Sequence, residues 1–163
     1  MKKTSCSATL AALALSFVDG VQTAGAAGTL SVSATVTDSC SVSADVLAFG
    51  VIDPLVNAGE ATDATAPVLV SCSNGTSYQV GLDGGNATTS ARAMTSDDGT
   101  LDYSLYRDAN RTETWGDNIG TDTVAGTGTG TTQTLTVYGR VSAGQQHVPP
   151  GAYADTVTVT VTY

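Results

Sequence analysis

The end of the chain alternates between apolar and polar residues, and this pattern limits the folds that the sequence can adopt. In "YADTVTVTVTY", Val157, Val159, Val161 and Tyr163 occupy every second position, and threonines separate them. A period of two places the four larger side chains on one face of an extended strand. No long stretch repeats apolar residues at the spacings of three and four that an amphipathic helix needs. The sequence therefore predicts an all-β protein.

Short alternating or apolar segments recur between clusters of Gly, Asn and Asp, a pattern typical of a β-sandwich. Asp98-Gly99 is a typical hairpin turn and separates two of these segments. Residues 116–132 are rich in Gly, Thr and Asp, and we predict a mobile loop there. The predicted strands are 42–49, 66–72, 78–82, the two arms of 92–106, 135–141 and 153–163.

A second alternating run, "GTLSVSATVTDSC", lies near the start of the chain at residues 28–40. Leu30, Val32, Ala34 and Val36 share one face of this run, and serines and threonines share the other. The pattern predicts a half-buried strand. The residues alone leave open whether this strand belongs to its own domain or pairs elsewhere.

The first 26 residues have the pattern of an export signal. Lys2 and Lys3 follow Met1, residues 8–18 are mostly apolar, and Ala24-Gly25-Ala26 supplies the small residues of a cleavage site. We predict cleavage near Ala26 or Ala27. The apolar run is too short to span a membrane, and no later run reaches the roughly 20 apolar residues that a span needs.

Charge argues against several classes of partner. Cleavage after residue 26 removes both lysines and Asp19, which leaves four arginines and fourteen acidic residues, a net charge of −10. This balance repels nucleic acid and anionic membranes. We therefore expect no nucleic-acid partner and no direct membrane insertion.

Two cysteines remain after the predicted cleavage, Cys40 and Cys72, because Cys6 lies in the signal. In an exported domain they are expected to form one disulfide. The alternative, a metal site with His147, lacks a fourth ligand and any C-x-x-C spacing. We expect neither a metal nor a cofactor.

No motif indicates catalysis, and we do not expect an enzyme. The single histidine, His147, stands beside two prolines, and the sequence has no G-x-S-x-G elbow. The carboxylates of "DDGTLD" and "GDNIGTD" do not match a calcium-binding loop, so we interpret them as turn formers. Five aromatic residues are candidates either for a sugar-binding face or for core and edge positions: Tyr103, Tyr106, Trp115, Tyr138 and Tyr153.

An ordered set of segments resembles a known family. Phe49-Gly50 follows the first cysteine, and "VLVSCSNGTSYQVGL" contains the second. "LDYSLYRD", "TWGD", "LTVYGRV" and "PPGAYADTVTVTVTY" follow in order. Together they resemble the spore coat protein U family, which includes subunits of archaic (Csu-type) chaperone–usher pili. The resemblance covers nearly all of the chain after the signal and implies an immunoglobulin-like sandwich that lacks its last strand.

The resemblance also implies how such a subunit assembles. A periplasmic chaperone first fills the groove left by the missing strand, and the N-terminal segment of the next subunit then replaces it at an outer-membrane usher. The implied domains are a signal (1–26), a donor segment (27–38) and a pilin domain (39–163), with the Cys40–Cys72 disulfide joining its first two strands. The implied donor side chains are Leu30, Val32, Ala34 and Val36, and the implied groove edge is Val157, Val159, Val161 and Tyr163.

We therefore expect a structural pilus subunit that is exported through the periplasm and displayed on the cell surface. Its partners would be identical or related subunits, the chaperone and the usher, and the fibre would support adhesion and biofilm formation. Two alternatives stay open: a monomeric secreted adhesive or carbohydrate-binding module, and a surface or spore coat component that assembles without an usher.

Overall fold

The computed structural model describes residues 24–163. Most of the predicted signal, residues 1–26, lies outside the described residues. The chain divides into two compact units, one ending at Thr35 and one spanning Val36–Tyr163. In the first unit, residues 24–35 have no regular secondary structure and their side chains are exposed. No helix within residues 24–163 is long and apolar enough to cross a membrane.

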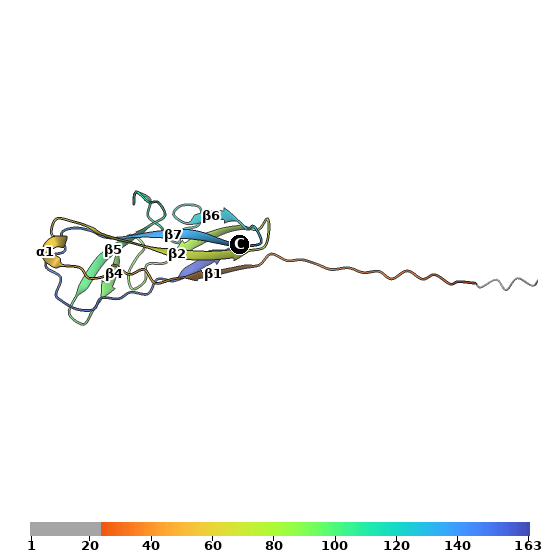
Figure 1. Cartoon of the computed structure of the whole chain (residues 1–163), viewed down its shortest axis with the longest axis horizontal. Helices are drawn as coiled ribbons and strands as arrows, with labels where there is room; N and C mark the ends of the chain where they lie inside the picture. Colours follow the sequence, from red (N-terminus) through yellow and green to blue (C-terminus); the bar gives the residue numbers. More distant parts are fainter. Residues whose placement is uncertain (1–23) are drawn as a thin grey trace, which may run out of the picture. The chain divides into compact units, whose positions relative to one another are not determined.

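The second unit is a β-sandwich, which confirms the predicted all-β fold (Figure 1). One antiparallel sheet has five strands in the order β1-β2-β7-β5-β4, and the other has three in the order β6-β3-β8. A short helix, α1 (Pro54–Asn57), lies at one end of the unit and the C-terminus lies at the other (Figure 1). The strands are β1 (Cys40–Ala44), β2 (Thr62–Cys72), β3 (Ser77–Leu82), β4 (Arg92–Thr95), β5 (Thr100–Tyr106), β6 (Val124–Thr127), β7 (Thr132–Val141) and β8 (Val159–Thr162).

The core lies between the two sheets and follows from the alternation within the strands. Val68 and Val70 of β2 are at most 1 % exposed, and they face Val80 of β3 within the same apolar cluster. Trp115 is also 1 % exposed, and its indole N–H donates a hydrogen bond to the carbonyl of Val80 (2.9 Å). Each large apolar side chain buried in this way contributes about 1.5–3 kcal/mol.

Arg92 is the one charged side chain in the core of the described residues. Its guanidinium donates to the backbone carbonyls of Leu82, Asp83, Thr89 and Trp115, at 2.8–3.1 Å. Burial lowers the pKa of Arg92, but an arginine remains charged at any physiological pH. The four carbonyls supply the hydrogen bonds that a buried charge requires, and they tie β4 to the end of β3.

Three predicted segments differ from the structure. The strand predicted at 153–163 is shorter, because only β8 (Val159–Thr162) pairs as a strand and the preceding residues form a single bridge, between Ala154 and Thr95. The strand predicted at 42–49 ends at Ala44, because no backbone hydrogen bond continues the β1–β2 pairing beyond that from Asp45 N–H to the Pro67 carbonyl (3.2 Å). The prediction of a mobile loop at 116–132 was wrong for residues 124–127, which form β6 and pair with β3. The Gly- and Thr-rich composition of this stretch concealed a strand that β3 stabilises by pairing. The predicted turn at Asp98-Gly99 is confirmed between β4 and β5.

The predicted disulfide is confirmed. Cys40 and Cys72 face each other across the β1–β2 pair, and their Cα atoms are 4.1 Å apart. The next residues extend the same pairing, because the backbone N–H of Ser73 donates to the Ser39 carbonyl (2.9 Å). The disulfide therefore fixes the start of β1 against the end of β2.

Replacement of Cys72 by Ser is expected to lower the free energy of unfolding by about 2–4 kcal/mol, because the open chain gains conformational entropy in the unfolded state. The cysteines are 32 residues apart, so the loop they close is long. Urea unfolding of the isolated subunit measures the change, and Ser41→Ala, at an exposed position of β1, is the control. An unchanged unfolding midpoint, or two free thiols in the native protein, would contradict this prediction.

Candidate functional site: an open groove along the sandwich

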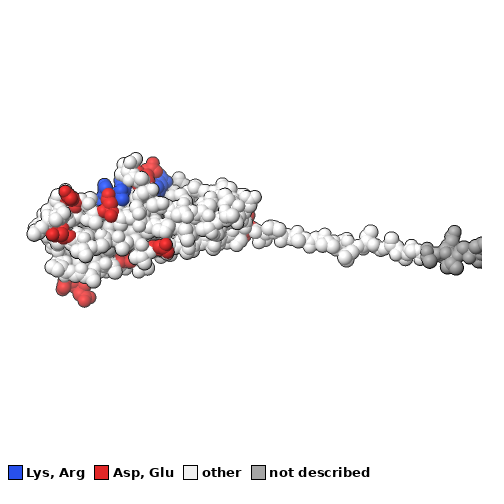
Figure 2. All heavy atoms as spheres, in the orientation of Figure 1, with Lys and Arg blue, Asp and Glu red and all other residues white. Residues whose placement is uncertain are grey.

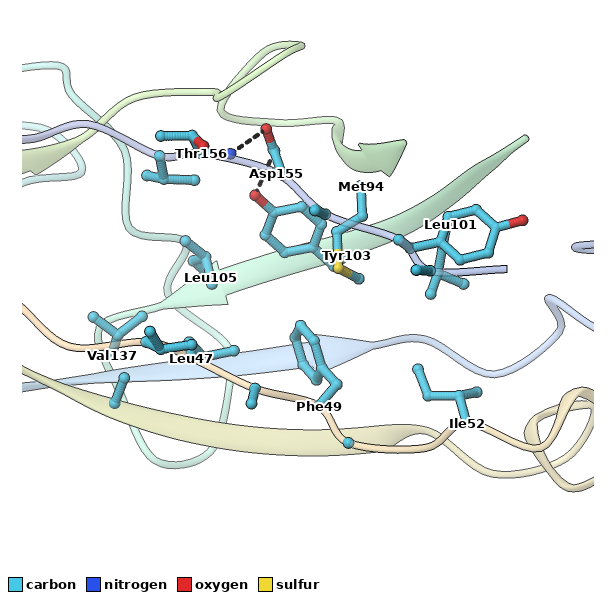
Figure 3. Close-up of a pocket in the computed structure, with 18 of the residues that line it drawn as sticks. Leu47, Phe49, Ile52, Met94, Leu101, Tyr103, Leu105, Val137, Asp155 and Thr156 are labelled. Atoms are coloured by element: carbon cyan, nitrogen blue, oxygen red, sulfur yellow. Dashed lines mark hydrogen bonds between the residues drawn. The ribbon is translucent and has the colours of Figure 1, made fainter. Parts of the chain in front are cut away.

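An apolar groove with a cavity volume of about 1000 Å³ opens along the sandwich. Two extended segments border it: residues 44–52, here the first rim, and residues 148–159, here the second rim. Figure 3 shows Leu47, Phe49 and Ile52 on the first rim and Asp155 and Thr156 on the second, with the floor between them. The floor residues are Ala66, Val68, Leu82, Met94, Leu101, Tyr103, Leu105 and Val137.

The first rim is held by side-chain packing. A Cβ atom on Gly139 would lie 2.9–3.0 Å from side-chain atoms of Leu47 and Phe49, so the glycine permits their close approach to β7. The Phe49 ring packs edge-on against Tyr103 of the floor, with ring centroids 6.2 Å apart. The backbone of residues 46–52 forms no hydrogen bond with another described residue. The first rim therefore retains unpaired backbone groups.

Burial alternates along the second rim, as in a strand that is paired on one side only. Tyr153, Asp155 and Val157 are half-buried, while Ala154 and Thr158 are exposed. The backbones of Ala154 and Thr158 form hydrogen bonds away from the groove, with β4 and with the loop after β3. The backbone N–H and C=O groups of Tyr153, Asp155 and Val157 form no hydrogen bond with another described residue. In a strand, the backbone N–H and C=O groups of successive residues point to opposite sides. The free groups of Tyr153, Asp155 and Val157 therefore share one side and form an open strand edge along the groove.

A polar pair lies within this apolar surface. The Tyr103 hydroxyl donates to Oδ2 of Asp155 (2.7 Å), and the backbone N–H of Thr156 donates to its Oδ1 (2.7 Å) (Figure 3). The backbone N–H of Asn86 also donates to Oδ1 (3.0 Å). Burial, together with the hydrogen bond to Asp155, raises the pKa of Tyr103 above its usual value. Tyr103 is therefore a neutral donor at physiological pH, and the carboxylate is satisfied without a cation.

Asp83 fixes the far side of the second rim. Its Oδ1 accepts hydrogen bonds from the backbone N–H of Thr158 (2.8 Å) and of Gly85 (3.0 Å). Burial raises the pKa of Asp83, but these hydrogen bonds outweigh that effect and lower it overall. Gly85 has φ +61°, and a Cβ atom there would collide with the Asp155 carboxylate. The rim is thus held firmly on one side and is open on the other.

The comparisons with known proteins agree with this architecture. Residues 26–160 match the family model described as Spore Coat Protein U domain. The chain belongs to this family. It is 33 % identical over 177 residues to Protein U of Myxococcus xanthus, and the alignment covers 99 % of this chain and 98 % of the relative.

A solved structure resembles this chain. It is the CsuC–CsuE chaperone–tip adhesion subunit pre-assembly complex from archaic chaperone–usher Csu pili of Acinetobacter baumannii. The match has a TM-score of 0.55 at 25 % sequence identity and covers 79 % of this chain. This chain spans 40 % of the length of that matched chain. The likeness supports an immunoglobulin-like sandwich.

The structure places the predicted site residues of this family member as follows. Val157 and Val159 line the groove, whereas Val161 pairs with Val80 in the β8–β3 ladder and Tyr163 is 60 % exposed and does not line it. The predicted donor side chains form no strand, and three of them are strongly exposed: Leu30 88 %, Val32 86 % and Val36 93 %. Their roles as donor and groove edge remain predictions.

Sequence reasoning missed the first rim and the Tyr103–Asp155 pair. Asp155 occupies one of the half-buried positions of the second rim. An acidic residue at an inward position of an alternating segment was the sequence signal that could have indicated a buried polar pair. The first rim gave no comparable signal, because its apolar residues do not alternate strictly.

The five aromatic candidates do not form one surface. Tyr103 and Trp115 are buried, and Tyr153 lines the groove. Tyr106 and Tyr138 are paired on the outer face of the five-stranded sheet. The guanidinium of Arg111 lies over the Tyr138 ring, 5.8 Å from its centroid. A continuous aromatic platform for a sugar is therefore not formed by these residues.

Charged side chains are sparse on the visible face, and the basic ones lie beside acidic ones (Figure 2). Arg111 and Arg140 both contact Asp63, at 3.3 and 2.7 Å, and Arg107 contacts Glu113 at 2.8 Å. Within residues 24–163, no three His, Cys, Asp or Glu side chains lie close enough together to hold a metal ion. Among the described residues, the groove combines exposed apolar surface with unpaired backbone groups, and this makes it the candidate binding site.

Proposed function

We propose that this protein is a structural subunit of a surface pilus, in which residues 28–37 of one copy complete the sandwich of the next. The observation that carries the proposal is the open strand edge at Tyr153, Asp155 and Val157 beside an apolar cavity of about 1000 Å³. An exposed edge over apolar surface is a site for strand addition, because the added strand satisfies the backbone groups and buries the surface.

The N-terminal segment has the properties of the added strand. Leu30, Val32 and Val36 are strongly exposed, and with Ala34 they form one apolar face at a period of two. If the pairing register of this segment shifted by one residue, the apolar side chains would point away from the groove. The alternation therefore allows only registers that differ by an even number of residues. Polymerisation follows if each segment enters the groove of another copy.

The structural relative supports a chaperone as the first partner. That relative is a complex of a chaperone and a pilus subunit before assembly. We propose that a periplasmic chaperone occupies the groove of this subunit first, and that an outer-membrane usher exchanges it for the next subunit's segment. The fibre would then be displayed on the cell surface and support adhesion and biofilm formation. The proposed role is structural and requires no cofactor.

A second candidate function is a coat component that assembles without an usher. The family description, Spore Coat Protein U domain, and the match to Protein U over nearly its full length favour this candidate. It uses the same groove and differs only in the export route.

Electron microscopy of the purified native protein is expected to reveal thin filaments, and co-expression with the chaperone alone is expected to give a soluble one-to-one complex. Deletion of the usher gene separates the two candidates, because a pilus subunit would then remain in the periplasm and a coat component would still reach the surface. A native protein that stays monomeric when it is concentrated without a chaperone, and forms neither filaments nor aggregates, would contradict both candidates.

A further inference from the structure

A strand that enters the groove, as the proposed function requires, can pair with only a short part of the second rim. Pro149 and Pro150 have no N–H group, so they cannot extend the pairing in that direction. At the other end β8 lies close to β1, which closes the groove. Burial alternates strictly over the seven residues 153–159, and the four half-buried ones that line the groove are Tyr153, Asp155, Val157 and Val159.

The direction of the incoming strand follows from the two rims. The first rim runs toward α1, and the second rim runs away from it, because Gly144 N–H, just before the second rim, donates to the carbonyl of Asn57 in α1 (2.8 Å). A strand between them is parallel to one rim and antiparallel to the other. Antiparallel pairing is the more stable of the two, and on the second rim the free backbone groups recur at every second residue, at Tyr153, Asp155 and Val157, as in one edge of a strand. The incoming strand therefore runs antiparallel to residues 153–159.

The N-terminal segment matches this length and contains one small residue. Its apolar face also has four positions over seven residues, 30 to 36, and three of the four side chains are large. When residues 30–36 of one copy pair antiparallel with all of residues 153–159 of another, the small residue Ala34 lies opposite Asp155. At that point the groove is lined by the Tyr103 hydroxyl and by the Phe49 ring against Tyr103.

We propose that Asp155 and Tyr103 are specificity-determining residues that set the register of the incoming strand by accepting only a small side chain. Val36, Ala34, Val32 and Leu30 then lie opposite Tyr153, Asp155, Val157 and Val159. A larger side chain opposite Asp155 displaces the carboxylate from the Tyr103 hydroxyl and leaves buried polar groups without partners. The flanking positions are apolar or aromatic and accept the large side chains.

Disulfide trapping reads the register directly. Residues opposite each other in a hydrogen-bonded antiparallel pair have Cα atoms about 5.5 Å apart, within the range that a disulfide bridges. The full-length double variant Val32→Cys, Val157→Cys is expected to give a covalent ladder of subunits on non-reducing gels. Val157→Cys combined with Ala34→Cys or with Leu30→Cys tests the registers shifted by two residues, and these variants are expected to stay uncrosslinked. A ladder from a shifted pair, but not from the first, would overturn the register.

A size series tests the role of the polar pair. Ala34→Leu is expected to lower the assembled fraction about tenfold, as overpacking of a fitted site does, whereas Val36→Leu changes it little. Adding Phe49→Ala, which opens space beside Tyr103, is expected to restore assembly of the Ala34→Leu variant. If Phe49 were only structural, its removal would lower assembly further. Equal tolerance of leucine at positions 34 and 36 would refute the assigned role.

These outcomes separate the register from the proposed function. If the unsubstituted chain forms no filaments, the proposed function fails. If filaments form and a shifted cysteine pair crosslinks, the subunit function stands and only the assignment of Asp155 and Tyr103 fails.

Discussion

The variant Val32→Asp is expected to abolish polymerisation and to leave the subunit folded and bound to its chaperone. In the proposed fibre this side chain enters the apolar groove of the next copy, where a carboxylate would lose its hydration without gaining a partner. A cost of about 4 kcal/mol corresponds to a loss of about 1000-fold in affinity. Filament yield and the amount of chaperone-bound subunit, measured side by side, give the result.

Ser33→Asp is the matched control, because Ser33 is on the opposite face of the same segment. It introduces the same charge one residue away, and its effect on filament yield is expected to be small. If Val32→Asp also eliminated the chaperone-bound subunit, the segment would belong to the core of its own domain and the proposed mechanism would be wrong.

A chain with a second copy of residues 28–38 after Tyr163 is expected to be a soluble monomer that unfolds at much higher denaturant concentration than the native subunit. Antiparallel pairing with residues 153–159 lets the added strand turn back directly after β8, so a flexible linker of about five residues suffices. Burial of three large apolar side chains contributes roughly 5–9 kcal/mol before the cost of ordering the strand. Guanidinium unfolding and size-exclusion chromatography measure the two effects.

The control for this chain carries Asp at the two added positions that copy Leu30 and Val32. It keeps the length and the linker but cannot bury the added strand, so its unfolding midpoint and its self-association are expected to match those of the native subunit. Equal stabilisation by the two versions would mean that the added strand does not occupy the groove.

Local pattern was enough to predict much of this fold. A period of two predicted half-buried strands at 66–72 and 153–163, because the alternation is a property of the extended chain itself. Burial alternates along both segments, but in the second only Val159–Thr162 is paired as a strand. The Asp98-Gly99 turn and the disulfide also follow from local chemistry and cysteine count. The exposed apolar face of Leu30, Val32 and Val36 was visible for the same reason.

Features that depend on contacts between distant segments were not predictable in this way. Strand β6 has a loop-like composition and exists because β3 pairs with it. The first rim, residues 44–52, reads as the continuation of a strand, yet its backbone finds no partner beyond Asp45.

The groove itself was decided by the tertiary structure. It requires that residues 148–159 be held by Thr95 and Asp83 on one side and lack a neighbour on the other, and no local pattern specifies a missing neighbour. The Tyr103–Asp155 hydrogen bond joins residues 52 positions apart in the sequence. By itself the sequence determined which residues can form strands and which faces are apolar, because backbone geometry and side-chain type decide those locally. Only the folded chain decided which strand edge stays open, because pairing depends on which segments meet in space.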